Sequence, residues 1–208
     1  MRGSRFLSPS AASVEVAPLS DGHALDLAAL FGRSAPLEVD LGCGDGLFLS
    51  QLAAEHPERN FLGVERLVGR VRSACKKIAR RELRNARVLR CEISSAVEEL
   101  LPSASVDVFH LLFSDPWPKR RHQNRRVVTE TFLRCASRAL KGHGRLRIAT
   151  DDAHYFTQIL RVADLVSDLG AISESEAAQL PPSTFETRFR GSGREIHRLV
   201  LRKVSAGK

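Results

Sequence analysis

Three glycines and two carboxylates in the first third of the chain have the spacing of a small-molecule site. Gly42, Gly44 and Gly46 follow a predicted strand and open a predicted helix, where glycine lets the backbone turn sharply and approach a ligand closely. Asp40 lies two residues before the first glycine, and Glu65 ends the next predicted strand, about 20 residues beyond the loop. A strand-end carboxylate in that place accepts hydrogen bonds from the hydroxyls of a ribose. These residues predict a site for a nucleoside-containing cofactor.

The spacing of the glycines distinguishes between two classes of cofactor. The dinucleotide fingerprint G-x-G-x-x-G has its last glycine one residue later, where this chain has Leu47. Carboxylates beside the loop suit a cationic group, whereas a pyrophosphate favours the opposite charge. The pattern D-x-G-x-G-x-G followed by a strand-end glutamate therefore resembles a Rossmann-like methyltransferase of the S-adenosylmethionine type, and a turn without a ligand is the alternative. Glu38, on the same strand face as Asp40, is expected to have a structural role.

A second distinctive segment follows the fourth predicted strand. It reads Ser-Asp-Pro-Trp-Pro-Lys-Arg-Arg-His over residues 114–122 and contains the only tryptophan of the chain. Two prolines stiffen it, and open α/β sheets bind their ligands at the carboxyl ends of strands. Asp115 is therefore a candidate active-site carboxylate. The alternative is a rigid turn in which Trp117 only packs.

Strands and helices alternate along the chain and must position these residues. Strands are expected over residues 37–41, 60–65, 87–91, 106–113, 144–149 and 195–202, and helices over 24–31, 47–55, 68–83, 126–139 and 153–168. This alternation predicts an α/β fold with a mostly parallel central sheet and helices on both faces. Residues 1–34, rich in Ser, Ala and Pro, are expected to form a partly mobile N-terminal extension, and residues 35–205 one domain.

Composition argues against several classes of protein. Four cysteines form no CxxC pair and seven histidines show no metal-binding spacing, so no metal site is expected. No apolar run reaches the roughly 18 residues of a membrane span, and no apolar region typical of a signal peptide follows the N-terminus. A cytoplasmic protein with reduced thiols is expected.

Positive charge is concentrated in two segments. The formal net charge is +8, and residues 66–90 contain ten Lys or Arg against a single acid, Glu82. Residues 119–126 add Lys119, Arg120, Arg121, Arg125 and Arg126. Cations beside a predicted active site suit the phosphates of a nucleic acid. For the first segment, a solvated helix face is an equal alternative.

The segment S-D-P-W-P-K-R-R-H resembles the signature loop of the tRNA (guanine-N7-)-methyltransferases. Further family-like pieces follow in order, namely Thr150-Asp151, Tyr155 and Ser183-Thr184-Phe185-Glu186, so the resemblance spans about residues 37–202. It implies a class I methyltransferase fold and methyl transfer from S-adenosylmethionine to N7 of the guanosine at position 46 in the variable loop of tRNA. Such an enzyme is expected in the cytoplasm as a monomer or homodimer, without metal.

The resemblance also implies roles for individual residues. Around the cofactor it implies Asp40, Gly42, Gly44, Glu65, Glu92 and Asp115, and Asp115 is also the implied catalytic residue. Near the substrate it implies Lys119, Asp151, Ser183, Thr184, Phe185 and Glu186. Two other functions stay open. One is an amino-group methyltransferase, because Asp-Pro-Trp loosely resembles Asn/Asp-Pro-Pro-aromatic loops, and the other is a non-catalytic RNA-binding or scaffolding protein on the same fold.

Overall fold

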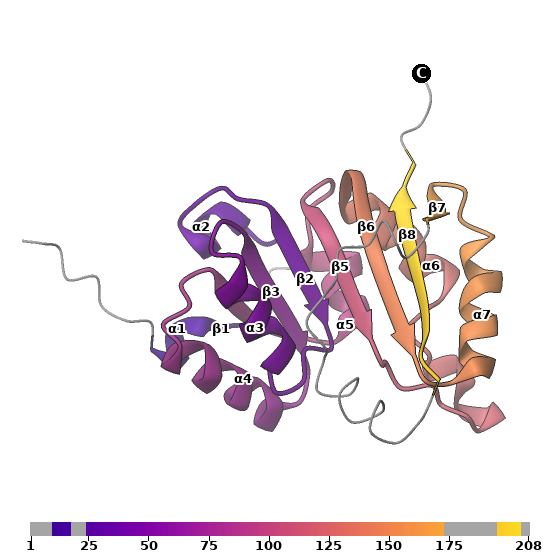
Figure 1. Ribbon diagram of the computed structural model, residues 1–208, viewed down its shortest axis with the longest axis horizontal. Helices are drawn as coiled ribbons and strands as arrows, with labels where there is room; N and C mark the ends of the chain where they lie inside the picture. Colours follow the sequence, from indigo (N-terminus) through magenta and orange to yellow (C-terminus); the bar gives the residue numbers. More distant parts are fainter. Residues whose placement is uncertain (1–9, 18–23, 173–194, 205–208) are drawn as a thin grey trace, which may run out of the picture.

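The computed structural model describes residues 10–17, 24–172 and 195–204, and their strands form one eight-stranded sheet (Figure 1). The strand order is β1-β4-β3-β2-β5-β6-β8-β7. The five pairs from β1 to β6 are parallel, and β8 runs antiparallel to both β6 and β7. The prediction of a mostly parallel α/β sheet is confirmed.

The elements have the following bounds. The strands are β1 (Glu15–Val16), β2 (Leu37–Leu41), β3 (Asn60–Glu65), β4 (Ala86–Arg90), β5 (Val106–Leu112), β6 (Leu140–Thr150), β7 (Leu169–Ile172) and β8 (His197–Lys203). The helices are α1 (Ala11–Val14), α2 (Leu27–Phe31), α3 (Leu47–Glu55), α4 (Val68–Arg80), α5 (Ile93–Ser95), α6 (Glu130–Ala139) and α7 (Ala153–Ala163). A π-helical turn, η1 (Ala96–Leu100), and a 3₁₀ helix, η2 (Arg120–Arg125), complete them.

Helices cover the sheet on both sides, and each side has its own core. Apolar residues of α3 and α4 pack on one face of β3 and β4. Apolar residues of η1, α6 and α7 pack on the opposite face. All residues of β2 and β3 are buried, which explains why these strands read as nearly continuous apolar runs. None of the helices in the described part of the chain is both long and apolar enough to cross a membrane.

The order of the strands reverses between β2 and β5. From β2 the chain adds β3 and β4 on one side, and from β5 it adds β6 on the other. Open α/β sheets bind ligands at such a switch point, beside the carboxyl ends of the strands. The glycine loop follows β2 and the Asp115 loop follows β5, so the topology brings the two predicted segments to one crevice.

The segment before residue 35 contributes to the fold. β1 pairs with β4 at the edge of the sheet, and Val14 is fully buried. The backbone N–H of Leu25 donates to the carbonyl of Leu100 at 2.8 Å. Parts of the predicted extension are therefore ordered against the domain. Its other residues lie outside the described ranges, so its mobility stays a prediction.

Several element boundaries differ from the sequence-based expectation. The helix expected from residue 126 begins only at Glu130, because the Thr129 hydroxyl accepts from the Phe132 N–H at 3.1 Å and caps it. The helix expected to reach residue 83 ends at Arg80, and β6 begins at Leu140 rather than 144. The short strands β1 and β7 were not predicted.

Candidate cofactor and substrate site

The glycine loop turns sharply over the end of β3. Gly42 has φ +86°, and the N–H groups of Gly42 and Cys43 both donate to the Val64 carbonyl, at 2.8 and 3.0 Å. Gly46 has φ +75°, and a Cβ there would lie 2.6 Å from Cβ of Ala74, so this glycine lets α4 pack against the loop. A Cβ on Gly42 or Gly44 would meet no atom closer than 3.5 Å. These two positions leave space for a ligand.

Two carboxylates lie side by side at this edge of the sheet. Asp40 on β2 pairs with Gly63 on β3, and Glu65 lies two residues further along β3. Asp40 is only 5% exposed, and no hydrogen bond among the described residues ends on its carboxylate. Burial, and then the charge of Glu65, raise the pKa of Asp40 to about 7. A cation beside Asp40 would oppose both effects and favour the ionised form.

Glu65 is held in place by the start of α4. Its Oε1 accepts from the backbone N–H groups of Arg66 and Leu67, at 2.8 and 2.9 Å. Its Oε2 lies 3.7 Å from Nη1 of Arg70. The carboxylate therefore has a set orientation and retains acceptor capacity for two donors such as ribose hydroxyls.

Glu92 lies beyond Glu65, after the next strand, β4. The N–H of Cys91 donates to the Glu65 carbonyl at 3.2 Å, which ties the two strand ends together. Oε2 of Glu92 accepts from the backbone N–H of Ser94 at 2.6 Å and so caps α5. The side chain is exposed, so it can accept a hydrogen bond from a ligand.

Asp115 projects from a loop with an unusual backbone. Phe113 and Trp117, on either side of it, have φ of +57° and +43°. Such values are uncommon for residues other than glycine and are found preferentially at functional sites. The Phe113 N–H donates to the Ala149 carbonyl at 2.7 Å, which ties the loop to the end of β6. Asp115 itself is exposed and free to contact a ligand.

Basic side chains pack around Trp117. The Arg125 guanidinium lies 5.0 Å from the centre of the Trp117 ring, and His122 meets that ring edge-on at 5.7 Å. Arg126 is only 3% exposed, and its Nε donates to the Pro116 carbonyl at 2.7 Å. The expectation that Arg126 belongs to a phosphate-binding surface is therefore wrong, because its guanidinium lies inside the protein. Lys119, Arg120 and Arg121 remain exposed.

Comparisons with known proteins decide the family. Residues 34–199 match a family described as "Putative methyltransferase". A curated tRNA (guanine-N(7)-)-methyltransferase from Leifsonia xyli subsp. xyli is 42% identical over 192 residues, which are 88% of this chain and 83% of that protein. The chain belongs to the tRNA (guanine-N7-)-methyltransferase family. The same name is carried by a relative from Cutibacterium acnes, 36% identical over 93% of this chain and 71% of its own length.

A further relative of this methyltransferase and two solved structures agree with this family and its fold. The tRNA (guanine-N(7)-)-methyltransferase of Thermotoga maritima is 33% identical over 88% of this chain, and the match spans only 59% of that protein. Among solved structures, the aminoglycoside resistance methyltransferase NpmB1 matches with a TM-score of 0.60 and 18% identity, over 84% of this chain and 90% of that one. A SAM-dependent O-methyltransferase from Thermotoga maritima matches with a TM-score of 0.57 and 14% identity, over 88% of this chain and 64% of that one. These likenesses confirm the class I Rossmann-like methyltransferase fold.

The fold of this methyltransferase brings five predicted carboxylates to one edge of the sheet. They lie at or just beyond the carboxyl ends of five neighbouring parallel strands, in the spatial order Glu92, Glu65, Asp40, Asp115 and Asp151. Parallel strands end at the same edge, so this gathering follows directly from the topology. Lys119 lies at the start of η2, four residues beyond Asp115. The segment from Ser183 to Glu186 lies outside the described residues.

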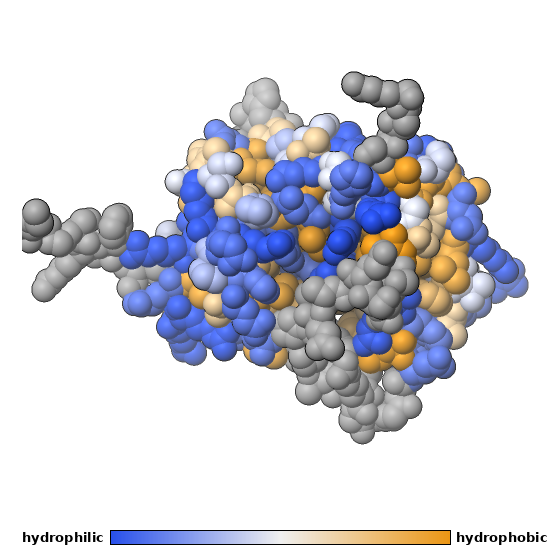
Figure 2. All heavy atoms as spheres, turned by 45° about the horizontal axis from the view of Figure 1, so that its top comes forward, coloured by the Kyte–Doolittle hydropathy of each residue, from blue (hydrophilic) through white to orange (hydrophobic). Residues whose placement is uncertain are grey.

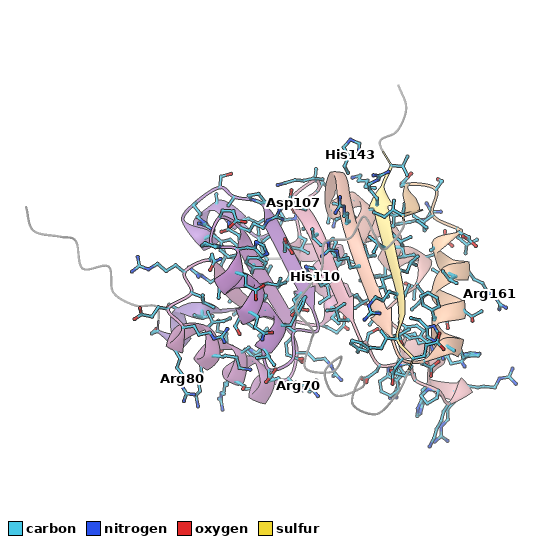
Figure 3. All side chains as sticks on the ribbon, in the orientation of Figure 1. Arg70, Arg80, Asp107, His110, His143 and Arg161 are labelled. Carbon is cyan, nitrogen blue, oxygen red and sulfur yellow. The ribbon has the colours of Figure 1, made fainter. Side chains whose placement is uncertain are left out.

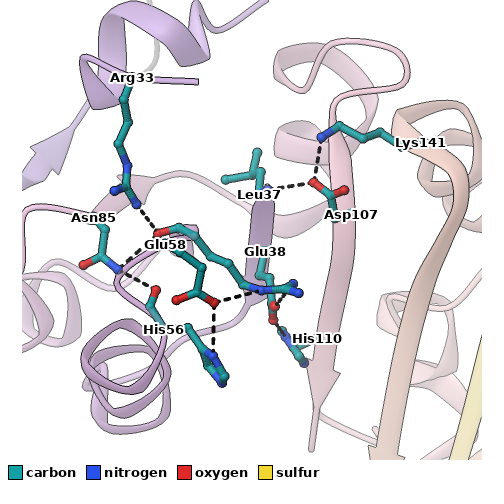
Figure 4. Close-up of polar contacts among 10 residues, drawn as sticks. Arg33, Leu37, Glu38, His56, Glu58, Asn85, Asp107, His110 and Lys141 are labelled. Atoms are coloured by element: carbon teal, nitrogen blue, oxygen red, sulfur yellow. Dashed lines mark hydrogen bonds and ion pairs between the residues drawn. The ribbon is translucent and has the colours of Figure 1, made fainter. Parts of the chain in front are cut away.

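Glu38 and His110 belong to a cluster of polar contacts (Figure 4). Oε2 of Glu38 lies 2.7 Å from Nε2 of His110, and Oε1 of Glu38 lies 2.7 Å from Nη1 of Arg59. Burial alone would raise the pKa of Glu38, but His110 and Arg59 outweigh burial and lower it. Both partners belong to the chain itself, His110 being buried and Arg59 partly exposed, in agreement with the expected structural role. Sequence reasoning did not identify His110, because a lone histidine on an apolar strand carries no spacing signal.

Proposed function

We propose that this protein binds S-adenosylmethionine in the crevice between β2 and β5 and transfers its methyl group to N7 of the guanosine at position 46 in tRNA. The observation that carries the proposal is the pair Asp40 and Glu65 above an open glycine loop. Burial and mutual repulsion make two ionised carboxylates unfavourable there. A cationic ligand removes that penalty, whereas a phosphate ligand adds to it.

The residues present fit this cofactor. Glu65 would accept from the two ribose hydroxyls, since its orientation is set by the Arg66 and Leu67 N–H groups. Asp40 would face the amino or sulfonium end, and Gly42 and Gly44 would leave room for the backbone to approach. Glu92 would lie toward the adenine base of the cofactor, beyond the ribose. Among the described residues there is no group of three potential metal ligands, and we propose a metal-free reaction.

Catalysis by this chain would rest on positioning and electrostatics. The cofactor supplies an electrophilic methyl group on a sulfonium. Guanine N7 carries an in-plane lone pair and no proton, so no residue must act as a base on it. Asp115 would accept hydrogen bonds from guanine N1–H and the 2-amino group and so hold the base in line. Its negative charge would also favour the positive charge that develops on the ring.

The substrate has to present an unstacked base to this crevice. A guanine in a folded RNA leaves its stack to reach an active site of this kind, at an energetic cost that other contacts must offset. Lys119, Arg120 and Arg121 are exposed beside Asp115 and would bind phosphates near the target base. We propose that Asp151 and residues 183–186 contact the substrate as well. A cytoplasmic location agrees with a tRNA substrate.

One experiment tests the proposal directly. Unmodified tRNA is incubated with the protein and S-adenosylmethionine, with and without EDTA, and the modified base is mapped by N7-specific chain cleavage. We expect N7-methylguanosine at position 46 in both reactions. A methyl group on an exocyclic amine would favour the amino-group reaction instead. Absence of cofactor binding by calorimetry would leave only the non-catalytic interpretation.

A further inference from the structure

Arg126 and Tyr155 form a buried stack behind the Asp115 loop. The Arg126 guanidinium lies 4.9 Å from the centre of the Tyr155 ring, and Tyr155 is fully buried on α7. Arg126 also hydrogen-bonds to Gln158 and approaches Nδ1 of His154 at 3.4 Å. No carboxylate among the described residues pairs with it. Burial of a guanidinium among neutral partners is costly, so its hydrogen bonds and its stacking on the ring must offset the loss of hydration.

Each member of this stack contacts one neighbour of Asp115. Nε of Arg126 donates to the carbonyl of Pro116 at 2.7 Å. The Tyr155 hydroxyl accepts from the Val128 N–H at 3.3 Å. The side chain of Ser114 lies close enough to that hydroxyl to lower the pKa of Tyr155, against the larger effect of burial, which raises it. The residue after Asp115 is therefore hydrogen-bonded to Arg126, and the residue before it lies beside the Tyr155 hydroxyl.

We propose that the Arg126–Tyr155 stack is a positioning device that orients Asp115 for methyl transfer. The proline ring fixes φ at Pro116, and holding its carbonyl fixes the peptide plane beyond it. The hydrogen bond to the Pro116 carbonyl thus limits the movement of the backbone that carries Asp115. Arginine suits this place because its planar fork stacks on the ring and still donates to several acceptors. The inference rests on the proposed role of Asp115.

The variant Arg126→Gln tests the device, and the only tryptophan of the chain reports on it. Trp117 lies two residues beyond Asp115, so acrylamide quenching of its fluorescence measures how firmly the loop is held. We expect stronger quenching, a kcat on tRNA reduced about 10- to 100-fold by misplacement of the carboxylate, and an unchanged KM for S-adenosylmethionine. Tyr155→Phe keeps the ring that Arg126 stacks on but lacks the hydroxyl, so its kcat should fall less than that of Arg126→Gln.

A matched control separates positioning from loss of stability. Leu101 is buried before the start of β5, whereas Asp115 follows the end of that strand, so Leu101→Ala removes packing away from the loop contacts. Compared at an equal loss of Tm, Leu101→Ala should keep its kcat and its Trp117 quenching. An equal loss of kcat in both variants, or unchanged Trp117 quenching in Arg126→Gln, would overturn the inference. If the wild-type protein methylated no tRNA, the proposed function would fail, while the quenching result would still report on the tie between Arg126 and the loop.

A different observation concerns the outer face of α4. Arg72, Lys76 and Arg80 are exposed and follow one another at intervals of four residues, so they form one stripe along the helix. None of the three makes a hydrogen bond or ion pair within the described part of the chain. The helix contains no acid, although like charges four residues apart destabilise a helix. Two other cations of α4 are paired, Lys77 with Asp45 at 2.8 Å and Arg70 with Glu65 at 3.7 Å.

The stripe leads away from the cofactor site. α4 begins three residues after Glu65, and its length of 13 residues corresponds to roughly 20 Å. Arg70 lies near the site end, and Arg80 points outward from the far end (Figure 3). Hydrophilic residues predominate over this part of the molecule (Figure 2). A guanine in the crevice would leave the adjoining RNA within reach of these side chains.

We infer that the stripe of Arg72, Lys76 and Arg80 binds the sugar-phosphate backbone of the tRNA at a distance from the methylated base. The partner is a polyanion because three unpaired cations in a row fit successive phosphates. This inference deepens the proposed function by naming a second contact surface. It narrows the basic segment 66–90 to three exposed side chains on one face of α4 that make no hydrogen bond or ion pair with the described residues.

The salt dependence of tRNA binding tests the stripe. The double variant Arg72→Gln/Lys76→Gln should lower the slope of log K against log salt by about 2, because each phosphate contact contributes about 1. The matched control is Arg161→Gln/Arg202→Gln, which removes the same charge from exposed positions on α7 and β8 and should leave the slope unchanged. Equal slopes in the two double variants would overturn the inference that the stripe binds tRNA. Failure of the wild-type protein to bind tRNA would instead overturn the proposed function.

Discussion

The carboxyl of Asp40 and the carboxylate of Glu65 are electrostatically coupled across two neighbouring parallel strands. Burial and the charge of Glu65 together raise the pKa of Asp40 to about 7. The folded protein therefore holds a proton on Asp40 at a pH where an unfolded chain does not. A cationic ligand favours the ionised form, so binding of the ligand and loss of this proton are linked.

This linkage predicts how cofactor affinity depends on pH. Below about pH 7 Asp40 is neutral, and a bound cation must first displace its proton. We expect the affinity for S-adenosylmethionine to rise as the pH is raised through about 7 and then to level off. Isothermal titration calorimetry in buffers of different ionisation enthalpy will show proton release below pH 7. Affinity that is independent of pH between 5.5 and 8 would contradict the coupling.

The same linkage sets the sign of the effect on stability. A carboxyl with a raised pKa in the folded state contributes stability at low pH, which is lost as the pH rises through about 7. The variant Asp40→Asn removes the buried charge, so its Tm should exceed that of the wild type at pH 8 and differ less at pH 5. It should also bind the cofactor weakly at both values. Thermal unfolding at the two pH values measures the difference.

Removal of the Glu65 carboxylate should weaken cofactor binding selectively. Glu65→Ala loses a charged acceptor, which corresponds to about 1–3 kcal/mol in the binding free energy. Binding of tRNA should change little, because the phosphate contacts that we propose lie on the basic segments. The exposed residue Glu58 provides a control, since Glu58→Ala removes the same charge from the surface. Cofactor affinity of Glu65→Ala equal to that of Glu58→Ala would exclude the assigned role.

Two glycines of the loop should respond differently to alanine. At Gly46 a Cβ would lie 2.6 Å from Ala74, so Gly46→Ala should destabilise the fold by about 1–3 kcal/mol. At Gly44 a Cβ would meet nothing closer than 4.0 Å, so Gly44→Ala should cost only about 1 kcal/mol for its positive φ. Its larger effect should be on cofactor affinity. Denaturant titration and calorimetry of both variants will show whether the effects separate in this way.

Asp115→Asn should abolish most of the methylation while tRNA still binds. Asparagine offers its oxygen to one donor of guanine, but its amide nitrogen faces the other donor, and the negative charge is lost. We expect a reduction in kcat of about 30- to 1,000-fold, which corresponds to about 2–4 kcal/mol in the transition state. Single-turnover methylation and filter binding of tRNA measure the two effects separately. Near wild-type turnover would show that the loop serves only as scaffolding.

Features that depend on neighbours along the chain were determined by the sequence itself. The strand, the glycine turn and the following helix at Asp40 to Glu55 are encoded in consecutive residues, because turns and apolar periodicity are local. The placement of Asp40, Glu65 and Asp115 at one edge also follows from the sequence, since alternating strands and helices imply parallel strands that end together.

Tertiary structure alone decided which of several similar side chains face the solvent. Arg121 and Arg126 are the same residue type five positions apart, yet the first is exposed and the second is buried on Tyr155, 29 positions further along. Likewise, β1 exists only because the distant strand β4 offers its edge. Burial depends on which surfaces meet after folding, and no short stretch of sequence contains that information.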